Sequence, residues 1–178
     1  LYEKVLTMDL EGRTGSYYDE AHKASIAYVE AAEFALARAS ASGRKPDPAP
    51  LRAFIKKHPA SVLVKDAYSS MSYYYGYQAA KEDAAKFFEE ATAKFPENKN
   101  LSSTYSERIV RDREPVDKGI ALAEKLKEIT GYPENPEVQQ NLAQLYVLKG
   151  DPAKADEEFG KDYIDGYVSG AVRALTGY

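Results

Sequence analysis

The sequence of 178 residues contains no cysteine and only two histidines, His22 and His58. Without cysteine the chain has no disulfide, no cysteine-ligated zinc and no thiolate nucleophile. No apolar run approaches the roughly 18 residues that a membrane-spanning helix needs, so we expect no transmembrane segment. The net charge of −4 gives no basic field for phosphates, and we expect no nucleic-acid partner. The sequence as a whole is 44% hydrophobic and 29% charged, a composition that predicts a soluble globular chain with a core of its own.

Catalytic motifs are also missing. The sequence has no G-x-S-x-G, H-E-x-x-H, Walker-type or G-x-G-x-x-G motif, and neither histidine is bracketed by a serine-based motif. The neighbouring acidic residues Glu89 and Glu90 diverge by roughly 100° around a helix, which favours a solvated face over a carboxylate pair. We therefore predict no catalytic residue, no metal site and no cofactor. A deep pocket that joined either histidine with carboxylates would be the observation that speaks for catalysis.

The strongest positive signal lies in residues 65–98. One set of residues recurs at i, i+3, i+4 and i+7, which places it on one helical face: Tyr68, Met71, Ser72 and Tyr75. A second set forms another helical stripe: Ala84, Phe88, Ala91 and Phe95. Pro96 then ends the second helix. With a turn containing Gly76 between them, the two helices are predicted to form an αα-hairpin.

These residues resemble the tetratricopeptide repeat, a pair of helices called A and B that recurs every 34 residues. Helix A has bulky groups and a Tyr near its end, and helix B has Ala, Phe and Ala before a final Pro. Ser72 stands where that family usually has Gly, and Tyr68 where it has Trp. Residues 136–169 give a second match, which is strongest in NLAQLYVLKGDPAKADEEF, starting at Asn141. Residues 99–135 give a divergent match, with Gly119 in place of Ala. The resemblance implies an all-α, right-handed superhelix, and we expect about nine helices.

The remaining segments are read as extensions of this array. Residues 1–45 are expected to be helical, with a short lead-in helix over 1–15 and one long helix over 16–42 that begins at the N-cap Ser16 and contains a first, degenerate helix A. His22 would then lie on a surface helix. After the linker GRKPDPAP, residues 46–64 form the matching helix B, with His58 at its C-terminus before Pro59. Residues 165–178 read as a capping or truncated helix. Since the sequence begins at Leu1 with no signal-like segment, we expect a processed or excerpted product.

The resemblance also implies a binding surface, because the first helix of each repeat lines a concave groove. The groove positions carried onto this sequence are Ser70, Tyr73, Tyr77, Thr104, Glu107, Arg111, Gln140, Asn141, Gln144 and Leu148. Tyr73 and Tyr77 lie one turn apart, and aromatic rings of this kind are typical of interface centres. One branch of the tetratricopeptide repeat family clamps the C-terminal carboxylates of a peptide with charged and amide side chains. Ser69 and Tyr73 stand at two of those positions in this sequence, which argues against such a clamp.

We therefore expect a non-catalytic scaffold that binds a protein or peptide partner in the groove. Two alternatives stay open at this stage. The chain could be a structural subunit of a larger envelope or extracellular assembly, or a homo-oligomer, joined through the apolar C-terminal helix; or it could be the helical accessory domain of a larger enzyme. The phrasing FIKKHPASVLVKDAYSSMSYYYG from Phe54 is similar to repeat proteins of bacterial cell envelopes. That similarity favours a periplasmic or exported protein, with a cytoplasmic one as the alternative.

Overall fold

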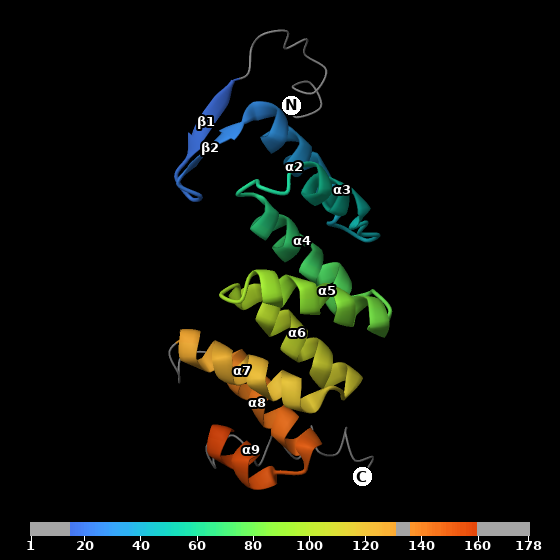
Figure 1. Cartoon of the computed structure of the whole chain (residues 1–178). Coiled ribbons are helices and arrows are strands. Elements are labelled where there is room, and N and C mark those ends of the chain that lie inside the picture. The colour runs from blue at the N-terminus through green and yellow to red at the C-terminus, as the bar shows by residue number, and fades with distance from the viewer. Residues whose placement is uncertain (1–14, 131–135, 160–178) are drawn as a thin grey trace. The chain divides into compact units, whose positions relative to one another are not determined.

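The computed structural model describes residues 15–130 and 136–159. Within these residues the chain has eight α-helices and one two-stranded sheet (Figure 1). The expectation of a mostly helical chain is confirmed, although the sheet was not expected. The chain divides into two compact units, the N-terminal unit (residues 1–78) and the C-terminal unit (residues 79–178). Apart from Gly15, the predicted lead-in helix lies outside the described residues, as does the predicted helix over 165–178.

The N-terminal unit begins with a β-hairpin, built from β1 (Ser16–Asp19) and β2 (Ala24–Ala27). The strands pair antiparallel, with Tyr17 opposite Ile26. Helix α2 (Tyr28–Ser40) follows directly. The prediction of one helix over residues 16–42, capped by Ser16, is therefore wrong up to Ala27, and His22 lies in the hairpin turn instead of on a helix.

A polar turn and one buried side chain explain the hairpin. Asp19 Oδ1 accepts hydrogen bonds from the backbone N–H groups of Ala21 and His22, at 2.8 and 3.1 Å. Such a side-chain turn satisfies backbone donors without a helix and so competes with helix formation. Lys23 continues the turn with a left-handed φ of 50°. On β2 only Ile26 is buried, and the residues on either side of it are exposed, which is the two-residue period of a strand.

Helices α3 (Ala49–Lys57) and α4 (Val64–Tyr77) complete the N-terminal unit. Pro50 lies in the first turn of α3, where its missing N–H breaks no helical hydrogen bond. Helix α2 packs against α3, and α3 packs against α4. The rings of Phe34 and Phe54 lie 5.4 Å apart in this core. Arg52 Nε donates a hydrogen bond to the Tyr75 hydroxyl at 2.9 Å, which ties α3 to α4.

The C-terminal unit consists of five described helices: α5 (Lys81–Lys94), α6 (Lys99–Asp112), α7 (Val116–Thr130), α8 (Pro136–Lys149) and α9 (Pro152–Phe159). The predicted apolar faces are buried, including Phe88 on α5, Tyr105 on α6 and Leu142 on α8. Phe88 and Tyr105 stack with ring centroids 4.9 Å apart, which joins α5 to α6. The side chain of Phe159, predicted to be a core position, lies outside what the structure describes.

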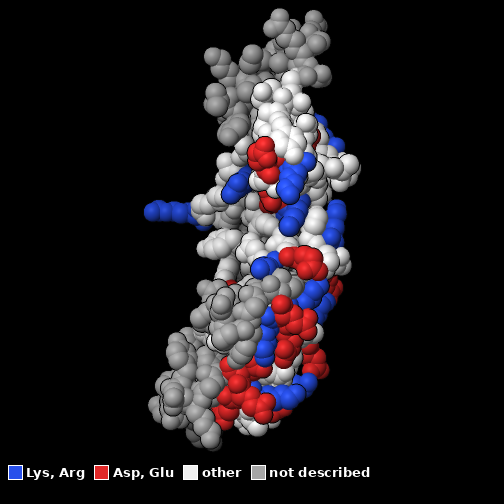
Figure 2. Space-filling view, turned by 90° about the vertical axis from the view of Figure 1, so that its left-hand side faces the viewer, with Lys and Arg blue, Asp and Glu red and all other residues white. Residues whose placement is uncertain are grey.

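Two rows of helices can be traced within the C-terminal unit. From α5 to α9 each helix packs against the next one in the sequence, and α6 also contacts α8. Ion pairs link α5, α7 and α9 along the other row: Lys118 pairs with Glu89 at 2.8 Å, and Lys127 pairs with Glu158 at 2.8 Å. Acidic and basic side chains accordingly lie side by side in the lower part of Figure 2. The odd-numbered helices are thus tied to one another through their charged surfaces.

Gly119 lies on α7, at a position where the sequence comparison above led us to expect alanine, and its packing explains the glycine. A Cβ atom at this position on α7 would lie 2.6 Å from Leu145 Cδ2 and 2.9 Å from Ile109 Cγ2. Both distances are far inside van der Waals contact, so α7 approaches α6 and α8 more closely than alanine would permit. The glycine is therefore part of the core packing.

The helix pair over residues 65–98 differs from its prediction in two details. Gly76 lies in the last turn of α4, and the turn itself is formed by residues 78–80. In addition, α4 belongs to the N-terminal unit and α5 to the C-terminal unit. The buried faces predicted for these helices are observed within each unit, with Met71 on α4 and Ala84 on α5 fully buried.

Candidate functional site

One face of α4 carries two exposed aromatic residues of the predicted groove. Tyr73 and Tyr77 are 57% and 48% exposed, and their ring centroids lie 5.2 Å apart. Ser70 is half-buried on the same face. Asp66 precedes Tyr73 by seven positions, so Asp66, Ser70, Tyr73 and Tyr77 form one stripe along the helix. We call these four residues the α4 stripe.

The groove positions on α6 and α8 are used in part for internal packing. Thr104 and Asn141 are buried, and Asn141 Nδ2 donates a hydrogen bond to Ser106 Oγ at 3.2 Å between α8 and α6. Asn141 therefore ties α8 to α6, and the burial of Thr104 and Asn141 leaves little of either side chain at the surface. Among the other positions Arg111 is exposed, and Glu107, Gln140, Gln144 and Leu148 are half-buried.

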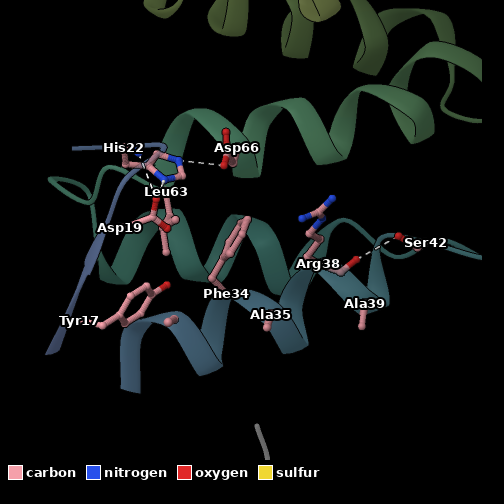
Figure 3. Close-up of a pocket in the computed structure, with 11 residues that line it drawn as sticks. Tyr17, Asp19, His22, Phe34, Ala35, Arg38, Ala39, Ser42, Leu63 and Asp66 are labelled. Atoms are coloured by element: carbon pink, nitrogen blue, oxygen red, sulfur yellow. Dashed lines mark hydrogen bonds and ion pairs between the residues drawn. The ribbon is translucent and has the colours of Figure 1, made fainter. Parts of the chain in front are cut away.

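The N-terminal unit contains a pocket that sequence analysis did not predict, since the pocket depends on the hairpin. Its volume is ≈ 450 Å³, and its walls come from the hairpin, α2, the start of α4 and the loop before it. Apolar walls are provided by Phe34, Leu63 and alanines of α2, while the polar groups include Asp19, His22, Arg38 and Asp66. Figure 3 shows Arg38 separated along α2 from the group formed by His22 and Asp19.

His22 bridges two carboxylates at one end of this pocket. Its Nε2 lies 3.0 Å from Asp66 Oδ2, and its Nδ1 lies 3.2 Å from Asp19 Oδ1 (Figure 3). The backbone N–H of His22, with the His22 ring and the backbone of Ala21, lowers the pKa of Asp19 below its usual value. His22 thus connects the hairpin to α4.

The pocket therefore joins a histidine with carboxylates, which is the arrangement that the sequence analysis named as favouring catalysis. A general base needs a ring nitrogen that is open to the proton of a nucleophile. His22 Nε2 lies within hydrogen-bond distance of Asp66 Oδ2, whereas Nδ1, although 3.2 Å from Asp19 Oδ1, is buried and makes no hydrogen bond within the described residues. The hydroxyl of Ser42, which also lines the pocket, donates to the carbonyl of Arg38 at 3.2 Å. The geometry does not assemble a nucleophile and its base.

The second histidine also pairs with a carboxylate. His58 is the C-cap of α3, as predicted, and its Nε2 lies 2.7 Å from Glu33 Oε2 on α2. Lys57 Nζ lies 2.5 Å from the other oxygen of Glu33. Burial raises the pKa of Glu33, but the hydrogen bonds from Lys57 and His58 outweigh burial and hold that pKa below its usual value. This cluster fastens α3 to α2, which is a structural role.

Residues 15–130 and 136–159 contain neither a group of metal-ligating side chains nor a membrane-spanning helix. In this part of the chain, no group of three or more His, Asp or Glu side chains is arranged to hold a metal ion. None of its helices combines the length and the apolar character needed to cross a bilayer. Comparison with protein-family models, with curated proteins and with solved structures gives no match to this chain. The functional argument therefore depends on the geometry of the two units.

Proposed function

We propose that this chain is a non-catalytic protein-interaction module that binds a peptide or protein partner along the α4 stripe. The observation that carries the proposal is the exposed pair of rings at Tyr73 and Tyr77. Tyrosine presents a large amphipathic surface with few rotatable bonds, so a partner can bury it at small entropic cost. Because the two rings already lie against each other, little further ordering is needed on binding.

The finer architecture belongs to the same proposal. The two rows of helices in the C-terminal unit, α6 with α8 and α5 with α7 and α9, support a right-handed superhelix of the tetratricopeptide type. Stacked helix pairs with a small rotation between them curve the row of first helices. Glu107, Arg111, Gln140, Gln144 and Leu148 would then form a second contact surface within this unit. An exported location, suggested by the phrasing around α4, is part of the proposal.

The absence of catalysis is also proposed, on the ground already given for the pocket. His22 Nε2 pairs with Asp66, and His58 Nε2 pairs with Glu33. Both histidines thus have partners that fix them in place. An interaction role explains the exposed rings, whereas a catalytic role leaves them without a purpose.

The test compares two kinds of exposed tyrosine. Partners are first isolated from the native source with the wild-type chain as bait, and the dissociation constant of the purified partner is then measured. We expect Tyr73→Ala/Tyr77→Ala to weaken binding at least tenfold, because a buried aromatic anchor contributes about 2 kcal/mol or more. Tyr18→Ala is the matched control, since Tyr18 is also 57% exposed but lies on β1.

The control should bind like the wild type. Both variants should unfold within about 0.5 kcal/mol of the wild type, because exposed side chains contribute little to folding. Equal affinity of the wild type and the double variant would remove the α4 stripe from the interface and with it this proposal.

A further inference from the structure

The pocket in the N-terminal unit has charges of opposite sign in different places. At the hairpin end, the carboxylates of Asp19 and Asp66 lie 3.2 and 3.0 Å from the two ring nitrogens of His22. At the other end the Arg38 side chain points from α2 toward α4 (Figure 3). Within the described residues no carboxylate pairs with the Arg38 guanidinium, although a guanidinium has five N–H donors to satisfy. The pocket thus has one negative end and one positive end.

Asp66 keeps one oxygen available for a ligand. Its Oδ2 faces His22, while Oδ1 has no partner within the described part of the chain, and the side chain is 44% exposed. His22 and Asp19 hold this carboxylate in place from the hairpin side. A cationic group of a ligand could therefore bind Oδ1 without displacing the histidine.

Between the charged ends the pocket is apolar. Phe34 and Leu63 are buried core residues that contribute part of the wall, and Ala31, Ala35 and Ala39 leave space because their side chains are small. A volume of ≈ 450 Å³ falls within the range of small-ligand sites, about 300–1,000 Å³. An apolar body with a cation at one end and an anion at the other would satisfy every part of this lining.

We propose that this pocket binds a small zwitterion, an apolar α-amino acid or a short peptide of such residues, with its ammonium at Asp66 and its carboxylate at Arg38. A guanidinium binds a carboxylate through two parallel hydrogen bonds, so Arg38 selects the carboxylate end. The apolar side chain of the ligand lies against Phe34 and Leu63. His22 is a positioning residue, which orients Asp66 and holds the hairpin as a wall of the pocket.

The proposal is tested with defined probes and the full chain. Leucine, Ala-Leu and Ala-Leu-Ala are titrated by calorimetry, and each peptide is compared with its N-acetylated and C-amidated forms. We expect saturable binding of at least one zwitterion, and at least tenfold weaker binding of both capped forms. The probe that binds tightest distinguishes a free amino acid from a peptide ligand.

Variants assign each end of the ligand. Arg38→Gln should weaken binding of the zwitterion about tenfold or more but leave the C-amidated form no weaker than with the wild type. Asp66→Asn should do the same with respect to N-acetylation. Arg44→Gln, an exposed arginine outside the pocket lining, is the control and should bind like the wild type. Unchanged helicity and melting temperature show that each variant is folded.

Three results would overturn the proposal: no saturable binding of any probe, equal binding of capped and uncapped forms, or unchanged binding by Arg38→Gln. The outcome is separate from the partner test. Tyr73→Ala/Tyr77→Ala leaves the pocket lining intact and should retain zwitterion binding even where it loses the protein partner.

Discussion

The described residues of the N-terminal unit include six large apolar or aromatic side chains that are exposed, whereas those of the C-terminal unit include none. The six are Tyr17, Tyr18, Tyr28, Val62, Tyr73 and Tyr77. In the C-terminal unit the large rings stack internally, as Phe88 does on Tyr105, and charged pairs cover the surface. The two units are therefore built from similar helices but present different surfaces to solvent.

The two units thus differ in whether their large apolar residues lie in the core or at the surface. Surface ion pairs between helices contribute only about 0–1 kcal/mol each, so the stability of the C-terminal unit comes mainly from its buried rings. The exposed tyrosines of the N-terminal unit contribute little to folding, and exposed aromatic groups that lie together mark interaction sites. This difference supports the proposed binding surface on the N-terminal unit, and four changes to the folded chain sharpen or break the comparison.

The largest effect is expected from Phe88→Ala. Phe88 is fully buried and contacts the rings of Phe87 and Tyr105. Removing a buried phenyl ring loses its transfer free energy and leaves a cavity, so the free energy of unfolding should fall by about 3–5 kcal/mol. Chemical denaturation gives the size, and amide hydrogen exchange should locate the loss in α5 and α6. An equal acceleration in α2 and α3 would show that the two units do not have separate cores.

The next effect appears at high pH and involves Tyr146. Burial, followed by its hydrogen bond to Glu124, raises the pKa of Tyr146 to about 12. Between pH 10 and 12 the unfolded chain loses this proton while the folded chain keeps it, so stability falls as the pH rises. The loss from this group amounts to about 2–3 kcal/mol. Tyr146→Phe should lose correspondingly less stability between pH 9 and 12; parallel curves for the two proteins would contradict the expectation.

A smaller loss is expected from Gly119→Ala. Alanine favours a helix over glycine by about 1 kcal/mol. The added methyl group, however, would overlap Leu145 and Ile109, and overpacking of this kind costs about 1–3 kcal/mol. We expect a net loss of about 1 kcal/mol in thermal or denaturant unfolding. A stabilised variant would show that α7 can move away from α6 and α8.

The smallest effect concerns acid and the N-terminal unit. The pKa of Glu33 is lowered in the folded chain, so its contribution is present above the ordinary glutamate pKa and is lost as the pH falls through the folded value. Glu33→Gln should cost about 1 kcal/mol at pH 7. This difference from the wild type should shrink in acid, because the wild-type carboxylate is then protonated. A difference that is independent of pH would remove the ion pairs with Lys57 and His58 from the account.

The helical segments could be predicted because their signal is local. The spacing of Tyr68, Met71 and Tyr75 places them on one face of α4, and all three are buried. The hairpin could not be predicted in the same way. Its turn contains neither glycine nor proline, and the alanines around it favour a helix, so the pattern pointed to the wrong element. The one local signal was Asp19 placed three residues before His22, which suits a side-chain turn.

The candidate sites also differ in whether a local sequence signal could reveal them. Tyr73 and Tyr77 were found from their spacing, since positions i and i+4 share a helical face in any context. The burial of Asn141 against Ser106 was missed, because a polar residue reads as a surface residue until its partner on another helix is known. The pocket of the N-terminal unit was missed for a related reason. Asp66 and His22 are separated by 44 positions, and only the fold brings them within 3.0 Å.

The sequence by itself determined where α3 to α8 place their apolar faces, since that follows from a helical period repeated within a few turns. It also determined that cysteine chemistry has no place in this chain. Only the tertiary structure decided that residues 16–27 form a hairpin, which tyrosines are exposed, and that His22 lies between two carboxylates. These features depend on contacts between segments distant in sequence, and neither local propensity nor residue spacing carries information about such contacts.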